Sequence, residues 1–226
     1  MNIIVLQHIK IEDPGYIKDL MLADGIKLTT IELDEGEKIP NDLGKFDGMF
    51  CMGGPMDTFM EQEYPWLKEE KKAIKEFVVN LKKPYLGFCL GCQLLGEVIG
   101  GKVVKSNPAE IGIMDINFTK EKDNDNLFSK FPKKIKSLQW HSYEVQGIEN
   151  NKDVTLLASS PVTKYQIFKY QNYAYGIQFH IEIKDTTVNE WGCVPEYKIA
   201  LENKLGDGAL EKFDNAAKDN MSDMNN

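Results

Sequence analysis

One ten-residue stretch decides how the rest of the chain is interpreted: Pro84-Tyr85-Leu86-Gly87-Phe88-Cys89-Leu90-Gly91-Cys92-Gln93. Its first half has the length and apolar character of a buried parallel strand, and its second half begins a helix. Between them lies Gly-x-Cys-x-Gly, a pattern typical of a sharp strand-to-helix turn that carries a nucleophile. Glycines two residues before and after the cysteine remove side chains that would collide in such a turn. The stretch therefore predicts a nucleophile elbow with Cys89 at its apex.

The predicted turn also favours a reactive thiol. It lifts the sulfur of Cys89 to the carboxyl end of the sheet, where open α/β sheets bind ligands. The sulfur then lies near a helix N-terminus, whose partial positive charge favours the thiolate. Taken alone, the same residues also fit a buried structural cysteine or a Cys89/Cys92 redox pair. Half a zinc site is a further interpretation, but the sequence has no second Cys pair to complete it, so we expect no metal.

A cysteine nucleophile benefits from a histidine that takes its proton and later returns it to the leaving group. The chain has three histidines, and His180 stands at the end of a strand-like run. Glu182 follows two residues later, and residues i and i+2 of an extended segment face the same side. Either residue alone could be structural, a hydrogen-bonded histidine or a solvated acid. Together they predict a triad in which His180 is the general acid/base and Glu182 holds the imidazole in its productive tautomer.

The order of the predicted elements favours an α/β fold, a three-layer α/β/α domain with a mainly parallel central sheet and antiparallel additions. Strands are predicted in the first half at Ile3–Gln7, Leu28–Leu33, Phe46–Met52 and Pro84–Phe88. Helices are predicted at Tyr16–Ala23, Trp66–Leu81 and Gln93–Ile99. Strands that suggest antiparallel pairing follow at Lys102–Lys105, Ile111–Phe118, Val154–Ala158, Tyr165–Tyr170 and Ala174–Phe179. A helix over Thr186–Leu201 should be interrupted or kinked at Pro195.

The sequence predicts one domain over residues 1–205, followed at 206–226 by a polar tail or short helix. Its 226 residues include 42% hydrophobic and 27% charged residues, as in a folded soluble protein. The net charge of −8 makes nucleic acid a poor partner. No run of apolar residues is long enough to suggest a signal peptide or a membrane span, so we expect a cytoplasmic protein with free thiols and no membrane partner.

With these residues in view, the sequence resembles the class I glutamine amidotransferases. The resemblance rests on Gly-x-Cys-x-Gly-x-Gln at residues 87–93 and Gly-x-Gln-Phe-His-x-Glu at residues 176–182, and it runs over roughly residues 40–185. Within the family the chain looks closest to stand-alone proteins similar to the glutaminase domain of GMP synthetase. Supporting matches are Met52-Gly53-Gly54-Pro55-Met56, Tyr64-Pro65-Trp66-Leu67, Glu110-Ile111-Gly112 and Trp140-His141-Ser142.

The resemblance implies a flavodoxin-like fold and a thioester mechanism without a cofactor. Cys89 would attack the γ-carboxamide carbon of glutamine, ammonia would leave, and water would hydrolyse the γ-glutamyl thioester. Backbone N–H groups of Gly54 and Leu90 would form the oxyanion hole. The resemblance also assigns substrate contacts, with the Trp-His-Ser segment as a loop lining the pocket. These contacts are Gly53, Gln93, His141 and Ser142.

Two departures from the family pattern stand out. Ile181 occupies a position where the family often has proline, and Cys92 follows the elbow where other residues are usual. Cys92 could form a regulatory disulfide with Cys89, which would switch catalysis off.

Three functions remain open at this level. The chain could supply ammonia from glutamine to a separate synthetase subunit, since no nucleotide-binding loop follows residue 185. It could be a free-standing hydrolase of γ-glutamyl peptides, which needs the same thioester chemistry. It could also be a non-enzymatic protein or a Cys89/Cys92 redox protein on the same fold. In the first two cases the partner is glutamine or a γ-glutamyl small molecule.

Overall fold

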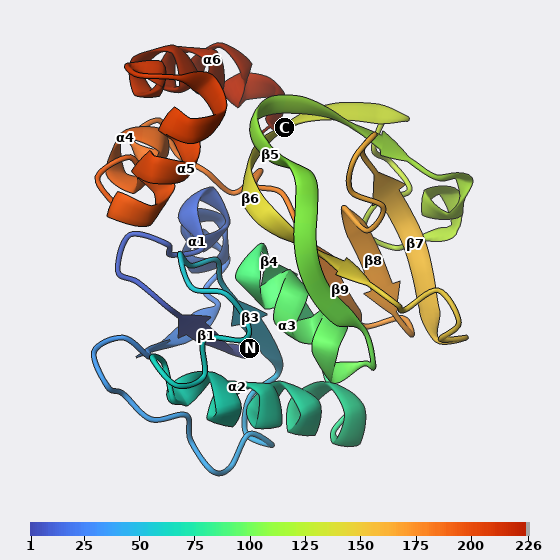
Figure 1. The fold of residues 1–226 in the computed structure, drawn as a ribbon. Coiled ribbons are helices and arrows are strands. Elements are labelled where there is room, and N and C mark those ends of the chain that lie inside the picture. The colour runs from blue at the N-terminus through green and yellow to red at the C-terminus, as the bar shows by residue number, and fades with distance from the viewer. Residues whose placement is uncertain (225–226) are drawn as a thin grey trace.

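Nine strands form a single sheet in the computed structural model, which describes residues 1–224 (Figure 1). From one edge to the other they are β2 (Lys27–Glu32), β1 (Asn2–Gln7), β3 (Gly48–Cys51), β4 (Tyr85–Phe88), β9 (Ala174–Ile177), β8 (Ile167–Tyr170), β7 (Val154–Ser159), β5 (Lys102–Phe118) and β6 (Lys134–Gln146). The strands from β2 to β9 pair in parallel, and those from β9 to β6 pair antiparallel. The predicted fold class, a parallel core with antiparallel additions, is confirmed.

The inner parallel strands β1, β3, β4 and β9 are buried on both faces, and their alternating side chains enter two different cores. Ile4 and Leu6 pack into one cluster, whereas Val5 packs into another. Helices α2 (Trp66–Lys75) and α3 (Leu90–Val98) cover the first cluster, as Figure 1 shows. Helix α1 (Gly15–Ala23) contributes Ile17 to the second. Two covered faces explain why these strands have almost continuous apolar sequences.

A third core lies under three helices at the C-terminal end, α4 (Thr187–Trp191), α5 (Pro195–Leu205) and α6 (Ala209–Met224). They pack against β5 and β6 at one end of the sheet (Figure 1). Pro195 begins α5 and separates it from α4, so the expected helix over 186–201 is two helices. The tail predicted over 206–226 contains α6, and its last two residues lie outside the described range. None of the helices in residues 1–224 has the length and apolar character needed to cross a bilayer.

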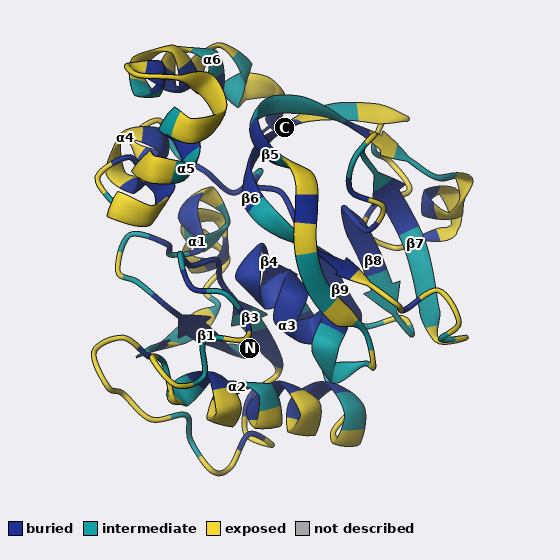
Figure 2. Cartoon of the chain, viewed as in Figure 1, coloured by how far each residue is buried: buried dark blue, intermediate teal, exposed yellow. Residues whose placement is uncertain are grey.

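The sequence-based prediction missed one long strand and divided another. Strand β6 spans 13 residues that were expected to include a pocket-lining loop at Trp140-His141-Ser142, and this expectation of a loop is wrong. Strand β5 is continuous where two strands were expected, with one irregularity between Lys105 and Glu110. β6 was missed because its sequence is rich in polar residues, yet most of the strand is buried, as Figure 2 shows. Gln139, for example, is fully buried and donates to Gln166 Oε1 at 3.0 Å.

Cys89 lies between β4 and α3 with a positive φ of 47° and a ψ of −100°. Few non-glycine residues adopt a positive φ, so the surrounding structure must enforce it. The backbone N–H of Cys89 donates to Ile177 O at 2.9 Å, and Gly91 N–H donates to Met52 O at 3.1 Å. The turn is therefore bonded to the strands on both of its sides.

Gly91 has no room for a side chain, because an added Cβ would lie 2.2 Å from Cys51 O. That neighbour is backbone and cannot move aside. We predict that Gly91→Ala lowers the free energy of unfolding by about 1–3 kcal/mol or more through overpacking. Gly44→Ala is the control, since its Cβ would meet only the flexible Asp42 side chain at 3.1 Å. Urea unfolding of both variants checks this, and equal midpoints would contradict it.

Candidate active site

The thiol of Cys89 opens into a small cavity of about 100 Å³ at the carboxyl end of β4. Its walls come from the loop after β3, the start of α3, strand β6 and helix α5. The lining residues are Gly54, Pro55, Met56, Asp57, Cys89, Leu90, Gln93, Trp140, His141, Ser142, Tyr143, Glu196, Tyr197 and Ala200. The cavity thus lies where the switch from strand to helix exposes the predicted nucleophile.

His180 and Glu182 lie together just after β9. His180 Nδ1 donates to Glu182 Oε1 at 2.6 Å, and Ile181 N–H donates to Glu182 Oε2 at 2.9 Å. Both carboxylate oxygens are therefore held. His180 is fixed through its backbone as well, because it exchanges two hydrogen bonds with Leu138 of β6. With Nδ1 directed at Glu182, Nε2 is the nitrogen that remains for Cys89.

The electrostatics of His180 favour its charged form. Burial by itself would lower the pKa of His180, but the charge of Glu182 and side-chain hydrogen bonds with Cys89 and Glu182 outweigh it. The pKa of His180 therefore lies well above its ordinary value. A histidine that stays protonated beside a thiol stabilises the thiolate, the nucleophilic form of cysteine.

Gly54 and Leu90 both line the cavity beside Cys89. A Cβ built on Gly54 would lie 3.3 Å from Leu90 Cδ2, which shows how closely the two residues approach each other. Gly53 does not line the cavity and lies behind it: a Cβ there would lie 3.3 Å from His180 Cε1. Gly53 therefore lies beside His180, on the side of the loop that faces away from the cavity.

The other expected substrate contacts line the cavity, and the side chains of Gln93 and His141 are hydrogen-bonded to the backbone beside it. Gln93 Nε2 donates to Tyr143 O at 3.1 Å and to Gln178 Oε1 at 3.2 Å. Gln178 Nε2 in turn lies 3.6 Å from Cys89 Sγ. His141 and Ser142 lie on β6, with His141 Nδ1 donating to Tyr143 O at 2.9 Å. The motifs on β6 and α3 thus meet at one cavity, and Gln178, which follows β9, is bonded to Gln93 and lies beside Cys89.

The class I glutamine amidotransferase family profile matches residues 16–190. The chain belongs to this family. It is 31% identical over 171 residues to one of the subunits of the glutamine-hydrolysing GMP synthase of Sulfolobus acidocaldarius, covering 75% of this chain and 83% of the relative. It is 32% identical over 148 residues to γ-glutamyl peptidase 3 of Arabidopsis thaliana, covering 63% of this chain and 57% of the relative. The crystal structure of a glutamine amidotransferase from Thermotoga maritima superposes with a TM-score of 0.85 at 28% identity, over 99% of this chain and 93% of the other.

Two residues outside the range matched by the amidotransferase profile join this site, and the sequence analysis missed both. The hydroxyl of Tyr197, on α5, donates to Oε1 of Glu12, which follows β1. Glu12 is 2% exposed, and a Cβ built on Gly53 would collide with its Oε2. Burial raises the pKa of Glu12 to about 7, although His180, Tyr197 and His8 oppose the rise. The only sequence signal that Glu12 lies near the site is its position after a parallel strand, where open α/β sheets bind ligands.

Cys92 is separated from the chemistry of Cys89. Its side chain is fully buried in the core, where a Cβ on Gly176 would lie 3.0 Å from Cys92 Sγ. Burial, and then the neighbouring Cys89, raises the pKa of Cys92 well above its ordinary value. All four thiols are free. Thiol exchange proceeds through an accessible thiolate, so this environment disfavours a Cys89/Cys92 redox pair.

Removing the charge of Glu182 should lower the pKa of His180. In Glu182→Gln the attraction that favours the imidazolium is lost while burial, which disfavours it, remains. NMR titration can follow His180 directly, because the chain has only three histidines. Glu190→Gln, which changes an exposed carboxylate on α4, should leave the titration unaltered. A His180 pKa that does not fall in Glu182→Gln contradicts this account.

Glu12 should make stability depend on pH. A carboxyl whose pKa rises on folding, here from 4.5 to about 7, stabilises the fold while protonated, and this contribution is lost as the pH rises through 7. We expect the free energy of unfolding of the wild type to fall, relative to Glu12→Gln, by about 2–3 kcal/mol between about pH 5 and 8. Urea unfolding across that range measures it. Glu196→Gln, which changes an exposed carboxylate on α5, is the control. Parallel curves for wild type and Glu12→Gln would contradict the prediction.

Proposed function

We propose that this chain hydrolyses the γ-amide of glutamine through a γ-glutamyl thioester on Cys89. The observation that carries the proposal is the position of His180, which is buried, donates to Glu182 through Nδ1 and lies near enough to Cys89 for the thiol to help raise the pKa of the imidazole. Membership of the class I glutamine amidotransferase family supports it.

The first half of the reaction forms the thioester. The thiolate of Cys89 attacks the γ-carbonyl carbon, and the carbonyl oxygen gains a negative charge as the carbon becomes tetrahedral. Backbone N–H groups of Gly54 and Leu90 would hold this oxygen, and such donors act strongly in a site that excludes water. The imidazolium of His180 then gives its proton to the leaving nitrogen, so that ammonia departs and the γ-glutamyl thioester remains.

The second half returns the enzyme to its starting state. The neutral imidazole of His180 takes a proton from water, and the resulting hydroxide attacks the thioester carbon. A second tetrahedral intermediate collapses with release of the sulfur, which gives glutamate and regenerates the thiolate beside the imidazolium. Glu182 keeps Nδ1 protonated throughout, so Nε2 remains the nitrogen that exchanges the proton.

The acceptor of the ammonia is proposed to be a separate synthetase subunit. The name of the Sulfolobus relative describes one subunit of a GMP synthase, which implies a further subunit in that enzyme. A second candidate is hydrolysis of γ-glutamyl peptides by the chain alone, favoured by the Arabidopsis relative named as a γ-glutamyl peptidase. The thioester chemistry is the same in both cases, and only the leaving amine differs.

Turnover measured with different leaving groups tests both candidates. We expect release of glutamate from glutamine or from γ-glutamyl dipeptides, and a loss of at least about 10³-fold in Cys89→Ala. Cys193→Ser, which changes the exposed thiol, should keep full activity. Preference for glutamine with low turnover would indicate dependence on a synthetase subunit, and preference for dipeptides would indicate the peptidase. Equal turnover in wild type and Cys89→Ala would refute the thioester.

A further inference from the structure

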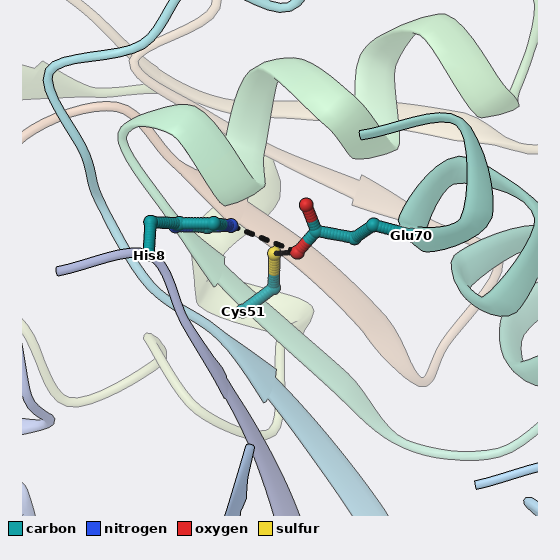
Figure 3. A group of neighbouring side chains, drawn as sticks. All are labelled: His8, Cys51 and Glu70. Atoms are coloured by element: carbon teal, nitrogen blue, oxygen red, sulfur yellow. Dashed lines mark hydrogen bonds and ion pairs between the residues drawn. The ribbon is translucent and has the colours of Figure 1, made fainter. Parts of the chain in front are cut away.

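A second buried polar cluster lies behind the cavity and plays no part in the steps above. His8, Cys51 and Glu70 point toward one another from the end of β1, the end of β3 and helix α2 (Figure 3). In residues 1–224 this is the only group of three side chains with metal-ligand atoms within 4.8 Å of one another. All three residues are fully buried. Groups of this kind are costly to bury unless they are paired and hydrogen-bonded.

Both ring nitrogens of His8 are engaged. Nδ1 lies 2.8 Å from Gly53 O, and Nε2 lies 2.8 Å from Glu70 Oε1. A backbone carbonyl can only accept, so Nδ1 donates to Gly53 O, and Nε2 faces a carboxyl group whose charge favours the protonated imidazole. Burial acts to lower the pKa of His8, but the charge and hydrogen bond of Glu70 and the Gly53 carbonyl raise it. Trp66 stacks on the ring at 5.5 Å between centroids and fixes its plane.

The Gly53 carbonyl, which accepts a hydrogen bond from His8, belongs to the same peptide group as the N–H of Gly54. A peptide group is planar and trans, so its C=O and N–H point in opposite directions. With Gly53 O directed at His8, the N–H of Gly54 is directed away from His8. Gly54 itself lines the cavity beside Cys89. His8 therefore determines which way this donor points.

This peptide needs such a constraint because it joins two glycines. Glycine adopts positive and negative φ values with similar ease, so a Gly-Gly peptide turns over at little cost. A flipped Gly53–Gly54 peptide would present a carbonyl where a donor is required, and a carbonyl repels an oxyanion. A hydrogen bond from a cation to the carbonyl also polarises the peptide, which makes its N–H a stronger donor.

We propose that the His8–Glu70 pair is a positioning device that locks the Gly53–Gly54 peptide with its N–H toward the oxyanion. The proposal rests on the thioester hydrolysis proposed above. His8 does not touch the substrate and acts through the peptide. Glu70 supplies the charge that keeps His8 protonated, and helix α2 thereby supports the oxyanion hole from the opposite side of the loop.

A bound metal ion would use the same three side chains, but the contacts fit hydrogen bonding better. Cys51 Sγ donates to Glu70 Oε1 at 3.2 Å. Burial, and then the charge of Glu70, raises the pKa of Cys51 well above its ordinary value. A metal ligand must be a thiolate, so a thiol held protonated suits a donor and does not suit a ligand.

The test compares three variants of the cluster. His8→Phe keeps a ring over Trp66 and removes both hydrogen bonds, and Glu70→Gln keeps an acceptor and removes the charge. Cys51→Ala is the matched control, because Cys51 belongs to the cluster but makes no hydrogen bond to Gly53. We expect kcat to fall about 10²-fold in His8→Phe, as for loss of one oxyanion donor. The fall should be smaller in Glu70→Gln, with KM nearly unchanged in both and Cys51→Ala close to wild type.

Alkylation of Cys89 by iodoacetamide separates positioning from general damage. This displacement uses the thiolate but creates no oxyanion, so its rate should be equal in wild type, His8→Phe and Glu70→Gln. Alkylation and kcat falling together would overturn the proposal in favour of a structural role. Unchanged kcat in His8→Phe would overturn it as well. So would one equivalent of metal in the purified wild type that is lost, together with activity, in Cys51→Ala.

The peptide itself provides a readout that does not depend on turnover. In a crystal structure of His8→Phe we expect the Gly53–Gly54 peptide to be flipped or present in two orientations. A single unflipped peptide would overturn the positioning role even if the wild type proved inactive. Absence of turnover in the wild type with a flipped peptide in the variant would instead refute only the proposed hydrolysis.

Discussion

The strained backbone of Cys89 is the constraint on which the rest of the site depends. Its φ of 47° is held by bonds to the strands on either side, from Cys89 N to Ile177 O and from Gly91 N to Met52 O. The same contacts fix the ends of β3 and β9 relative to the sulfur. Those strand ends carry the glycine loop and His180, so the turn that exposes the proposed nucleophile also sets where its proposed partners lie. A relaxed turn would lose the alignment of all three.

The parts of the candidate site that are local in the chain could be predicted from the sequence. The strand, Gly-x-Cys-x-Gly and helix are contiguous, and His180 and Glu182 are two residues apart on an extended segment, so simple geometry relates each pair. The parallel core was predictable for a similar reason, because strands buried on both faces have unbroken apolar sequences. These local motifs also carry the family resemblance, which the profile match confirms.

The features that were missed depend on contacts between distant residues. Strand β6 was not predicted because Ser137, Gln139 and His141 make it polar, and their burial depends on partners such as Gln166, 27 residues from Gln139. The bond between Glu12 and Tyr197 spans 185 residues, and the pair of His8 and Glu70 spans 62. A buried charged residue looks like a surface residue in sequence until its partner is known, because only the partner offsets the cost of burying it.

The short segment after β1 therefore does more for the site than its sequence suggests. His8 holds the carbonyl of Gly53, and Glu12 Oε2 occupies the space where a Gly53 side chain would begin, with only 2.1 Å to an added Cβ. The glycine loop is thus held by His8 on one side and by Glu12 on the other. Only glycine fits at position 53 between them. Tyr197 ties Glu12 to α5, whose residues form one wall of the cavity. The β1 segment consequently links the glycine loop, where the oxyanion would form, to a C-terminal wall that lies beyond residue 190, the end of the family match.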